Sequence, residues 1–122
     1  AQIAALTVVR MLELLSESKD VHDISRYTTV KEEYAEKCKS EIRIIWGDFF
    51  KAEDLSAEIY SLVYQFIELA SKARQGNDKK QGEELLEAVN QFAEVFWSKR
   101  GVKTKRVAAP YKVEAQIAIP EL

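Results

Sequence analysis

The chain has 122 residues, of which 47% are apolar and 31% are charged, a balance that excludes a wholly disordered protein and leaves room for one domain. One cysteine excludes an internal disulfide, and no stretch approaches the roughly 20 apolar residues that a membrane span needs. Both prolines, Pro110 and Pro120, lie near the C-terminus, so the segments before them are free of helix breakers. We predict an all-α protein that is cytoplasmic and has no contact with a membrane.

The first half of the chain predicts two helices. Apolar residues recur at helical spacing over Ile3–Glu17, on a face broad enough to be covered from more than one side. Residues 18–28 are polar and predict a connection. Thr29 and Glu32 have the spacing of a capping box, in which the hydroxyl and the carboxylate each accept a backbone N–H. We therefore expect the second helix to span Val30–Lys51.

Two further helices follow. Asp54 or Ser56 is expected to cap a third helix that ends near Gln75, and its two apolar rows predict that it is the most buried of the four. A Gly-Asn-Asp turn then separates it from a fourth helix over Asp78–Arg100. Similar helix lengths and short connections are typical of an antiparallel four-helix bundle, which we place at residues 1–101.

Residues 102–122 differ from the rest and predict an extended C-terminal tail. They have no helical period, and apolar residues alternate with other residues from Lys112 to Ile119, which is the spacing of a strand. A single strand is unstable in water. We therefore expect Val113, Ile117 and Ile119 to be buried, either against this bundle or against a second subunit.

Histidine and cysteine are too few for most metal or nucleophilic sites. His22 and Cys38 are the only residues of their types, which leaves no zinc site of the Cys/His kind and no di-iron bundle with two Glu-x-x-His motifs. Cys38 lies on the apolar face of the second helix and is expected to be a small buried hydrophobe. We expect no metal, no cofactor and no catalytic residue.

Paired carboxylates offer one enzymatic alternative. Glu33 with Glu36, and Glu84 with Glu87, each have the i, i+3 spacing that lets two carboxylates share Mg²⁺ in all-α nucleotide pyrophosphatases. Those enzymes also need a Glu-x-x-Asp on the next helix, and we expect that no Glu of this chain is followed by Asp at that spacing. A solvated helix face is the preferred interpretation, and the magnesium enzyme is kept as an alternative.

The aromatic and basic residues are the better lead to function. Aromatic side chains fall on the edges of the apolar stripes, and residues 97–106 form a basic segment, in contrast to the acidic body before it. Such a combination is typical of a contact surface. The sequence predicts a non-enzymatic protein–protein interaction or assembly module, acting on a protein partner or as a homo-oligomer. A nucleic-acid or phosphate-binding module that uses residues 99–112 is a weaker alternative. The residues predicted to bind a partner are Trp46, Phe50, Tyr60, Tyr64, Trp97, Lys103, Lys105, Arg106, Val113, Ile117 and Ile119.

Overall fold

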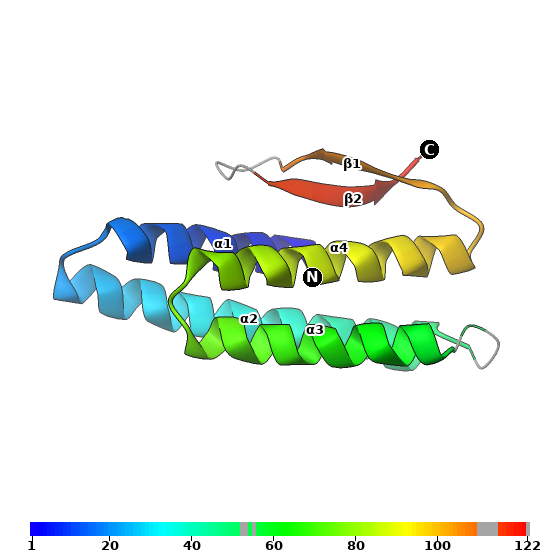
Figure 1. Ribbon diagram of the computed structural model, residues 1–122, viewed down its shortest axis with the longest axis horizontal. Coiled ribbons are helices and arrows are strands. Elements are labelled where there is room, and N and C mark those ends of the chain that lie inside the picture. The colour runs from blue at the N-terminus through cyan, green and yellow to red at the C-terminus, as the bar shows by residue number, and fades with distance from the viewer. Residues whose placement is uncertain (52–53, 55, 110–114, 122) are drawn as a thin grey trace.

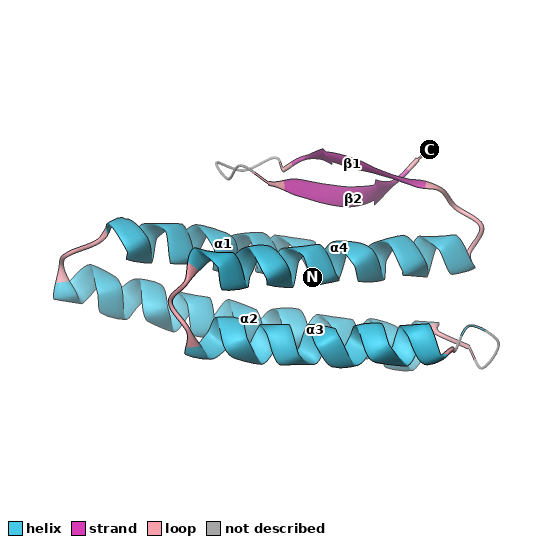
Figure 2. Cartoon of the chain, viewed as in Figure 1, coloured by secondary structure: helices cyan, strands magenta, loops and turns pink. Residues whose placement is uncertain are grey.

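The chain folds into four helices followed by a β-hairpin (Figures 1 and 2). The computed structural model describes residues 1–51, 54, 56–109 and 115–121. In chain order its elements are α1 (Gln2–Glu17), α2 (Val21–Phe49), α3 (Ala57–Gln75), α4 (Lys79–Lys99), β1 (Thr104–Ala108) and β2 (Gln116–Pro120). The all-α bundle predicted from the sequence is confirmed, and the C-terminal tail is a hairpin that packs on it.

The helices form two layers with the hairpin on one outer face. Helix α1 packs on α2 and α4, and α3 packs on the same two helices from the opposite corner. The hairpin lies over the layer of α1 and α4, on the side away from α2 and α3 (Figure 1). None of the helices in the described part of the chain is long and apolar enough to cross a membrane.

Three helices begin at side-chain caps, and one of the predicted starts is wrong. Ser56, one of the two expected caps, begins α3, and Asp78, where the fourth helix was expected to start, caps α4. Helix α2 is capped by Asp20 and starts at Val21, nine residues before the predicted start, whereas the Thr29 hydroxyl donates back to the Ser25 carbonyl. The first turns of α2 extend beyond the turn between α3 and α4 (Figure 1), so most of their side chains are exposed to solvent. Their sequence carries no apolar stripe, because there is no neighbouring helix to pack against.

Helix α1 carries the densest part of the core, so the prediction that the third helix is the most buried is wrong. Six of the 16 residues of α1 are buried, against five of 19 in α3. Phe66 on α3 is fully buried, as its apolar row predicts, but Leu62 and Leu69 of the same row are only half-buried. The cause is coverage, because the hairpin lies over the layer of α1 and α4 and α3 has no hairpin over it.

Gly82 sets the separation of α1 and α4. A Cβ atom built on Gly82 would lie 2.8 Å from Leu12 Cδ1 and 3.2 Å from Val9 Cα, closer than side chains normally approach. The missing side chain therefore lets the two helix backbones approach closely. Gly47 in α2 has no such neighbour, because nothing lies within 4 Å of a Cβ built there.

A buried lysine ties α2 to the turn between α3 and α4. Lys31 is 1% exposed, and its ammonium group donates to the Gly76 carbonyl, next to the end of α3. Burial lowers the pKa of Lys31 because it disfavours the charged form. Sequence reasoning missed this residue, since a lysine beside Glu32 and Glu33 reads as part of a solvated face.

The hairpin buries a different residue from those predicted. Strands β1 and β2 pair antiparallel, with Arg106 opposite Ala118 and Val107 opposite Ile117. Ala118 is 2% exposed, whereas Ile117 and Ile119 are only half-buried, and Val113 lies outside the described residues. A strand is confirmed at Gln116–Pro120, and residues 112–114 of the predicted strand lie outside the described residues. The fully buried residue is Ala118, which the alternation placed on the opposite side from Ile117 and Ile119.

Candidate functional site

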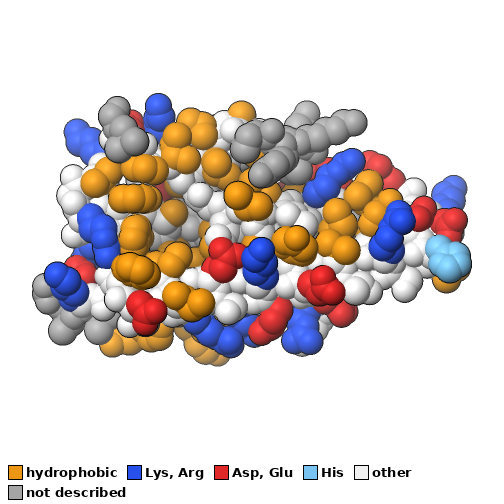
Figure 3. Space-filling view, turned by 180° about the vertical axis from the view of Figure 1, so that it is seen from behind, with side chains coloured by type: hydrophobic (Ala, Val, Ile, Leu, Met, Phe, Trp, Pro, Cys, Tyr) orange, Lys and Arg blue, Asp and Glu red, His pale blue; other side chains and the backbone are white. Residues whose placement is uncertain are grey.

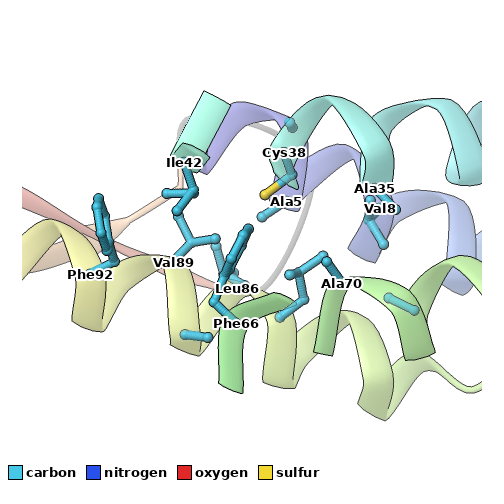
Figure 4. Close-up of a cluster of buried hydrophobic side chains, with 14 of the residues drawn as sticks. Ala5, Val8, Ala35, Cys38, Ile42, Phe66, Ala70, Leu86, Val89 and Phe92 are labelled. Carbon is cyan, nitrogen blue, oxygen red and sulfur yellow. The ribbon is translucent and has the colours of Figure 1, made fainter. Parts of the chain in front are cut away.

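The single thiol lies inside the core. Cys38 is 0% exposed and sits beside Ala5 in the centre of the bundle (Figure 4). Its Sγ donates to the Ala1 carbonyl oxygen over 3.5 Å. Burial raises the pKa of Cys38 to about 12. The residue is therefore a neutral, small hydrophobe, as predicted, and offers no thiolate.

The single histidine is far from that thiol. His22 is exposed on the first turn of α2, and Cys38 lies 16 residues further along the same helix. At 1.5 Å per residue the two are about 24 Å apart, so they cannot bind one metal ion. Within the described residues no three His, Cys, Asp or Glu side chains gather as a metal site.

The carboxylate pairs also lack the arrangement of a cation site. Glu33 and Glu36 are exposed, and Glu36 faces Arg74 at 3.7 Å. Glu87 is bound by Arg106, whose hydrogen bonds lower the pKa of that carboxyl. These carboxylates are thus solvated or paired with arginine.

The expectation that the chain has no Glu-x-x-Asp is wrong, because this spacing occurs at Glu17 and Asp20, between two helices. Glu17 is the last residue of α1, and Asp20 is the N-cap of α2, where it accepts a hydrogen bond from the His22 backbone. Because a cap and a helix end separate the two carboxylates, this spacing does not put them on one helix face.

Most of the predicted aromatic residues belong to the end of α2, the start of α3 and the end of α4, and Trp46 of α2 contacts Tyr60 of α3. Figure 3 shows many hydrophobic side chains exposed on one face of the molecule. Trp46 meets Tyr60 edge to face at 5.8 Å, and Trp97 meets Phe96 at 5.2 Å. Trp46, Trp97 and Phe50 are half-buried, so much of their surface is used in packing. Tyr60 and Tyr64 are 50% and 67% exposed. Only these two of the predicted aromatic contacts present a large free surface.

The predicted basic residues divide into two kinds. Arg106 reaches α4, where it donates two hydrogen bonds to Glu87, of 2.9 and 3.0 Å, and two to Glu94, of 3.1 and 2.9 Å. These hydrogen bonds raise the pKa of Arg106 and occupy four of the five N–H groups of its guanidinium. Lys103 and Lys105 are exposed. Arg106 therefore holds the hairpin on the bundle and is not available to a phosphate.

Side chains of α1 and α4 meet the backbone of β2 at the start of α1. We call Gln2, Asn90, Gln116 and Ala118 the α1 junction. Asn90, 1% exposed, donates to the Gln116 carbonyl and accepts from the Ala118 backbone. Gln2 donates to the Asn90 side chain at 3.1 Å and to the Ala118 carbonyl at 2.6 Å. The junction is neutral, so it can bind and orient backbone but has no acid or base. Sequence reasoning missed Asn90. Its place directly after Val89, on the apolar face of the fourth helix, could have indicated a buried polar side chain that needs hydrogen-bond partners.

A groove of about 200 Å³ adjoins the α1 junction. Gln2 lies on its rim, and Phe92, Phe96 and Trp97 of α4 line much of the remainder. None of the side chains that line it in the described part of the chain is charged, so these side chains provide no group that could transfer a proton or bind a metal ion.

Comparison with known proteins identifies relatives of the whole bundle. The family described as nickel-containing superoxide dismutase matches residues 1–100. The chain is 29% identical over 99 residues to the nickel superoxide dismutases of Streptomyces seoulensis and Streptomyces coelicolor, covering 80% of this chain and 76% of each relative. A native nickel superoxide dismutase structure superposes with a TM-score of 0.79 at 27% identity, covering 82% of this chain and 87% of that one. The apo form of nickel superoxide dismutase superposes with the same TM-score.

These matches overturn the functional predictions. The expectation of a non-enzymatic interaction module is wrong, because the family that matches residues 1–100 is a family of enzymes. The two alternatives, a nucleic-acid or phosphate-binding module and a magnesium-dependent pyrophosphatase, fail on the same finding. The side chains agree with this, since Arg106 is paired with Glu87 and Glu94, and the carboxylate pairs form no metal cluster within the described residues.

The burial of Cys38 predicts an unreactive thiol. At pH 8 the folded protein should react with a disulfide reagent far more slowly than the same chain unfolded in guanidinium chloride. The unfolded chain should release one equivalent of the reagent's thiol at once. Equal reaction rates in the folded and unfolded states would show that Cys38 is not buried.

The pKa of Cys38, raised from 9.0 to about 12, also predicts that the free energy of unfolding falls between about pH 9 and 12 relative to Cys38→Ala, because the folded state holds the proton more tightly.

Proposed function

Because this chain belongs to the nickel-containing superoxide dismutase family, we propose that residues 1–100 form the helical scaffold of a superoxide dismutase that depends on nickel. Such an enzyme converts two superoxide anions and two protons into dioxygen and hydrogen peroxide. The observation that carries the proposal is the family match over residues 1–100, supported by a TM-score of 0.79 to the native enzyme structure.

The side chains of this chain do not fit a nickel ion. Thiolates and imidazoles are the protein ligands suited to nickel, and the sequence has one cysteine and one histidine. Cys38 is buried with its pKa raised to about 12, and His22 is exposed about 24 Å away along α2. We therefore propose that the nickel donors of a dismutase built on this bundle come from outside residues 1–122, and that the bundle folds without the metal.

The first arm of the test uses the 122-residue chain itself. Incubated with one equivalent of Ni²⁺ and passed through a desalting column, it should retain no nickel and should leave the spontaneous decay of superoxide unchanged. Its unfolding temperature should be the same with Ni²⁺ or with a chelator, because no folded-state site binds the ion. Stoichiometric nickel with an absorption band of thiolate coordination would show that the donors are in this chain after all.

The second arm restores what the chain lacks. The match leaves about a quarter of the Streptomyces seoulensis enzyme unmatched, since 76% of it is covered. Those unmatched segments, joined to the corresponding ends of this bundle, should produce a protein that binds nickel and accelerates superoxide decay. The matched control is the same fusion prepared without nickel. A fusion that folds and binds nickel but leaves superoxide decay unchanged would reject the proposed function.

We also propose that the protein forms a homo-oligomer, and that Tyr60 and Tyr64, among the residues predicted to bind a partner, act there. Support comes from Tyr60 and Tyr64, which lie one turn apart on α3 and are largely exposed. In sedimentation, the wild-type mass should exceed that of one chain, and Tyr60→Ser combined with Tyr64→Ser should reduce it. Gln65→Ser, also exposed on α3, is the control. An unchanged mass in the double variant would reject this surface.

A further inference from the structure

The hairpin lies beyond the part of the chain that the family shares. The family match ends at residue 100, whereas the two strands lie at Thr104–Ala108 and Gln116–Pro120. Strand β2 turns its outer edge to the bundle. The backbone N–H of Ala118 donates to the Asn90 side chain over 3.0 Å, and the Gln116 carbonyl accepts from the same side chain over 2.9 Å. A buried asparagine thus pairs with a strand edge that would otherwise be left with unpaired backbone groups.

The same contact includes the first turn of α1. Gln2 donates to Asn90 Oδ1 and to the Ala118 carbonyl. One side chain of α1, one of α4 and the backbone of β2 therefore form a closed set of hydrogen bonds. Each member satisfies polar groups of the other two, so the loss of any one leaves buried polar atoms without a partner.

A second anchor holds the hairpin at a different point. Arg106 on β1 is opposite Ala118 on β2 and binds Glu87 and Glu94 on α4. The hydrogen bonds from its guanidinium group go to α4 and none go to α1. The two anchors are therefore joined through the strand pair, and weakening the arginine anchor loosens β2 without touching Gln2 directly.

From these contacts we propose that the hairpin is a strap that holds the first turn of α1 against α4, so that docking of the hairpin and ordering of that turn are one cooperative event. The inference goes beyond the proposed function, because it concerns an element outside the family match and needs no metal. The strap gives α1 a support that residues 1–100 alone do not provide.

Amide hydrogen exchange on the full chain tests the strap. Arg106→Gln should accelerate exchange at Ala118 and also at Ala5, whose amide is bonded to the Ala1 carbonyl. Both rates should rise by a similar factor, roughly twofold to tenfold for the loss of one or two net hydrogen bonds. Gln2→Ala should give the reciprocal result, with faster exchange at Ala118. Exchange at Phe66 in the core should not change in either variant.

Two control variants make the outcome decisive. Arg26→Gln removes an exposed arginine from an ion pair with Asp23, and Gln65→Ala removes an exposed glutamine from α3. Neither should change exchange at Ala5 or Ala118. The proposal is overturned if Arg106→Gln accelerates amide exchange at Ala118 but not at Ala5, because the hairpin would then have no effect on the order of α1. It is also overturned if exchange at Ala118 is unchanged in Arg106→Gln.

Discussion

The close contact of α1 with α4 at Gly82 is the constraint on which the rest of the structure depends. Gly82, Leu86 and Asn90 follow each other at intervals of four residues, so they lie on one face of α4, and all three are buried. The first of them admits the backbone of α1, the second fills the core, and the third binds the hairpin. One face of one helix thus packs the bundle and receives the element added beyond residue 100.

Much of this fold could be predicted from the sequence because it is repetitive. Apolar residues at helical spacing and the caps Ser56 and Asp78 specify where α3 and α4 begin. The start of α2 could not be found in this way, since its first turns extend past the neighbouring helices and carry no apolar stripe. The greater burial of α1 than of α3 could not be predicted either, because it depends on the hairpin over the layer of α1 and α4, which is a tertiary contact.

The candidate site was less accessible to sequence reasoning. Burial of Cys38 was predicted correctly, because the residue stands on an apolar stripe. The network of Gln2, Asn90 and Ala118 joins residues 28 and 116 positions apart, and no local pattern reports such a contact. Enzymatic identity was missed for a chemical reason. The chain has one thiol, which is buried, and one imidazole, which lies far from it, so its sequence contains no motif typical of a metal site or of acid–base catalysis.

The stability of the bundle comes from helix packing, and its relationship to a family of nickel enzymes extends over all four helices. The most direct measurement of its central claim compares Gly82→Ala with Gly47→Ala by urea unfolding. Both changes remove a helical glycine, worth about 1 kcal/mol in favour of alanine, so the free energy of unfolding of Gly47→Ala should rise. Gly82→Ala should instead fall below wild type, about 2 kcal/mol below the control, because the new methyl group meets Leu12 and the backbone of Val9. An equal rise in both variants would contradict the claim that α1 and α4 need the space at Gly82.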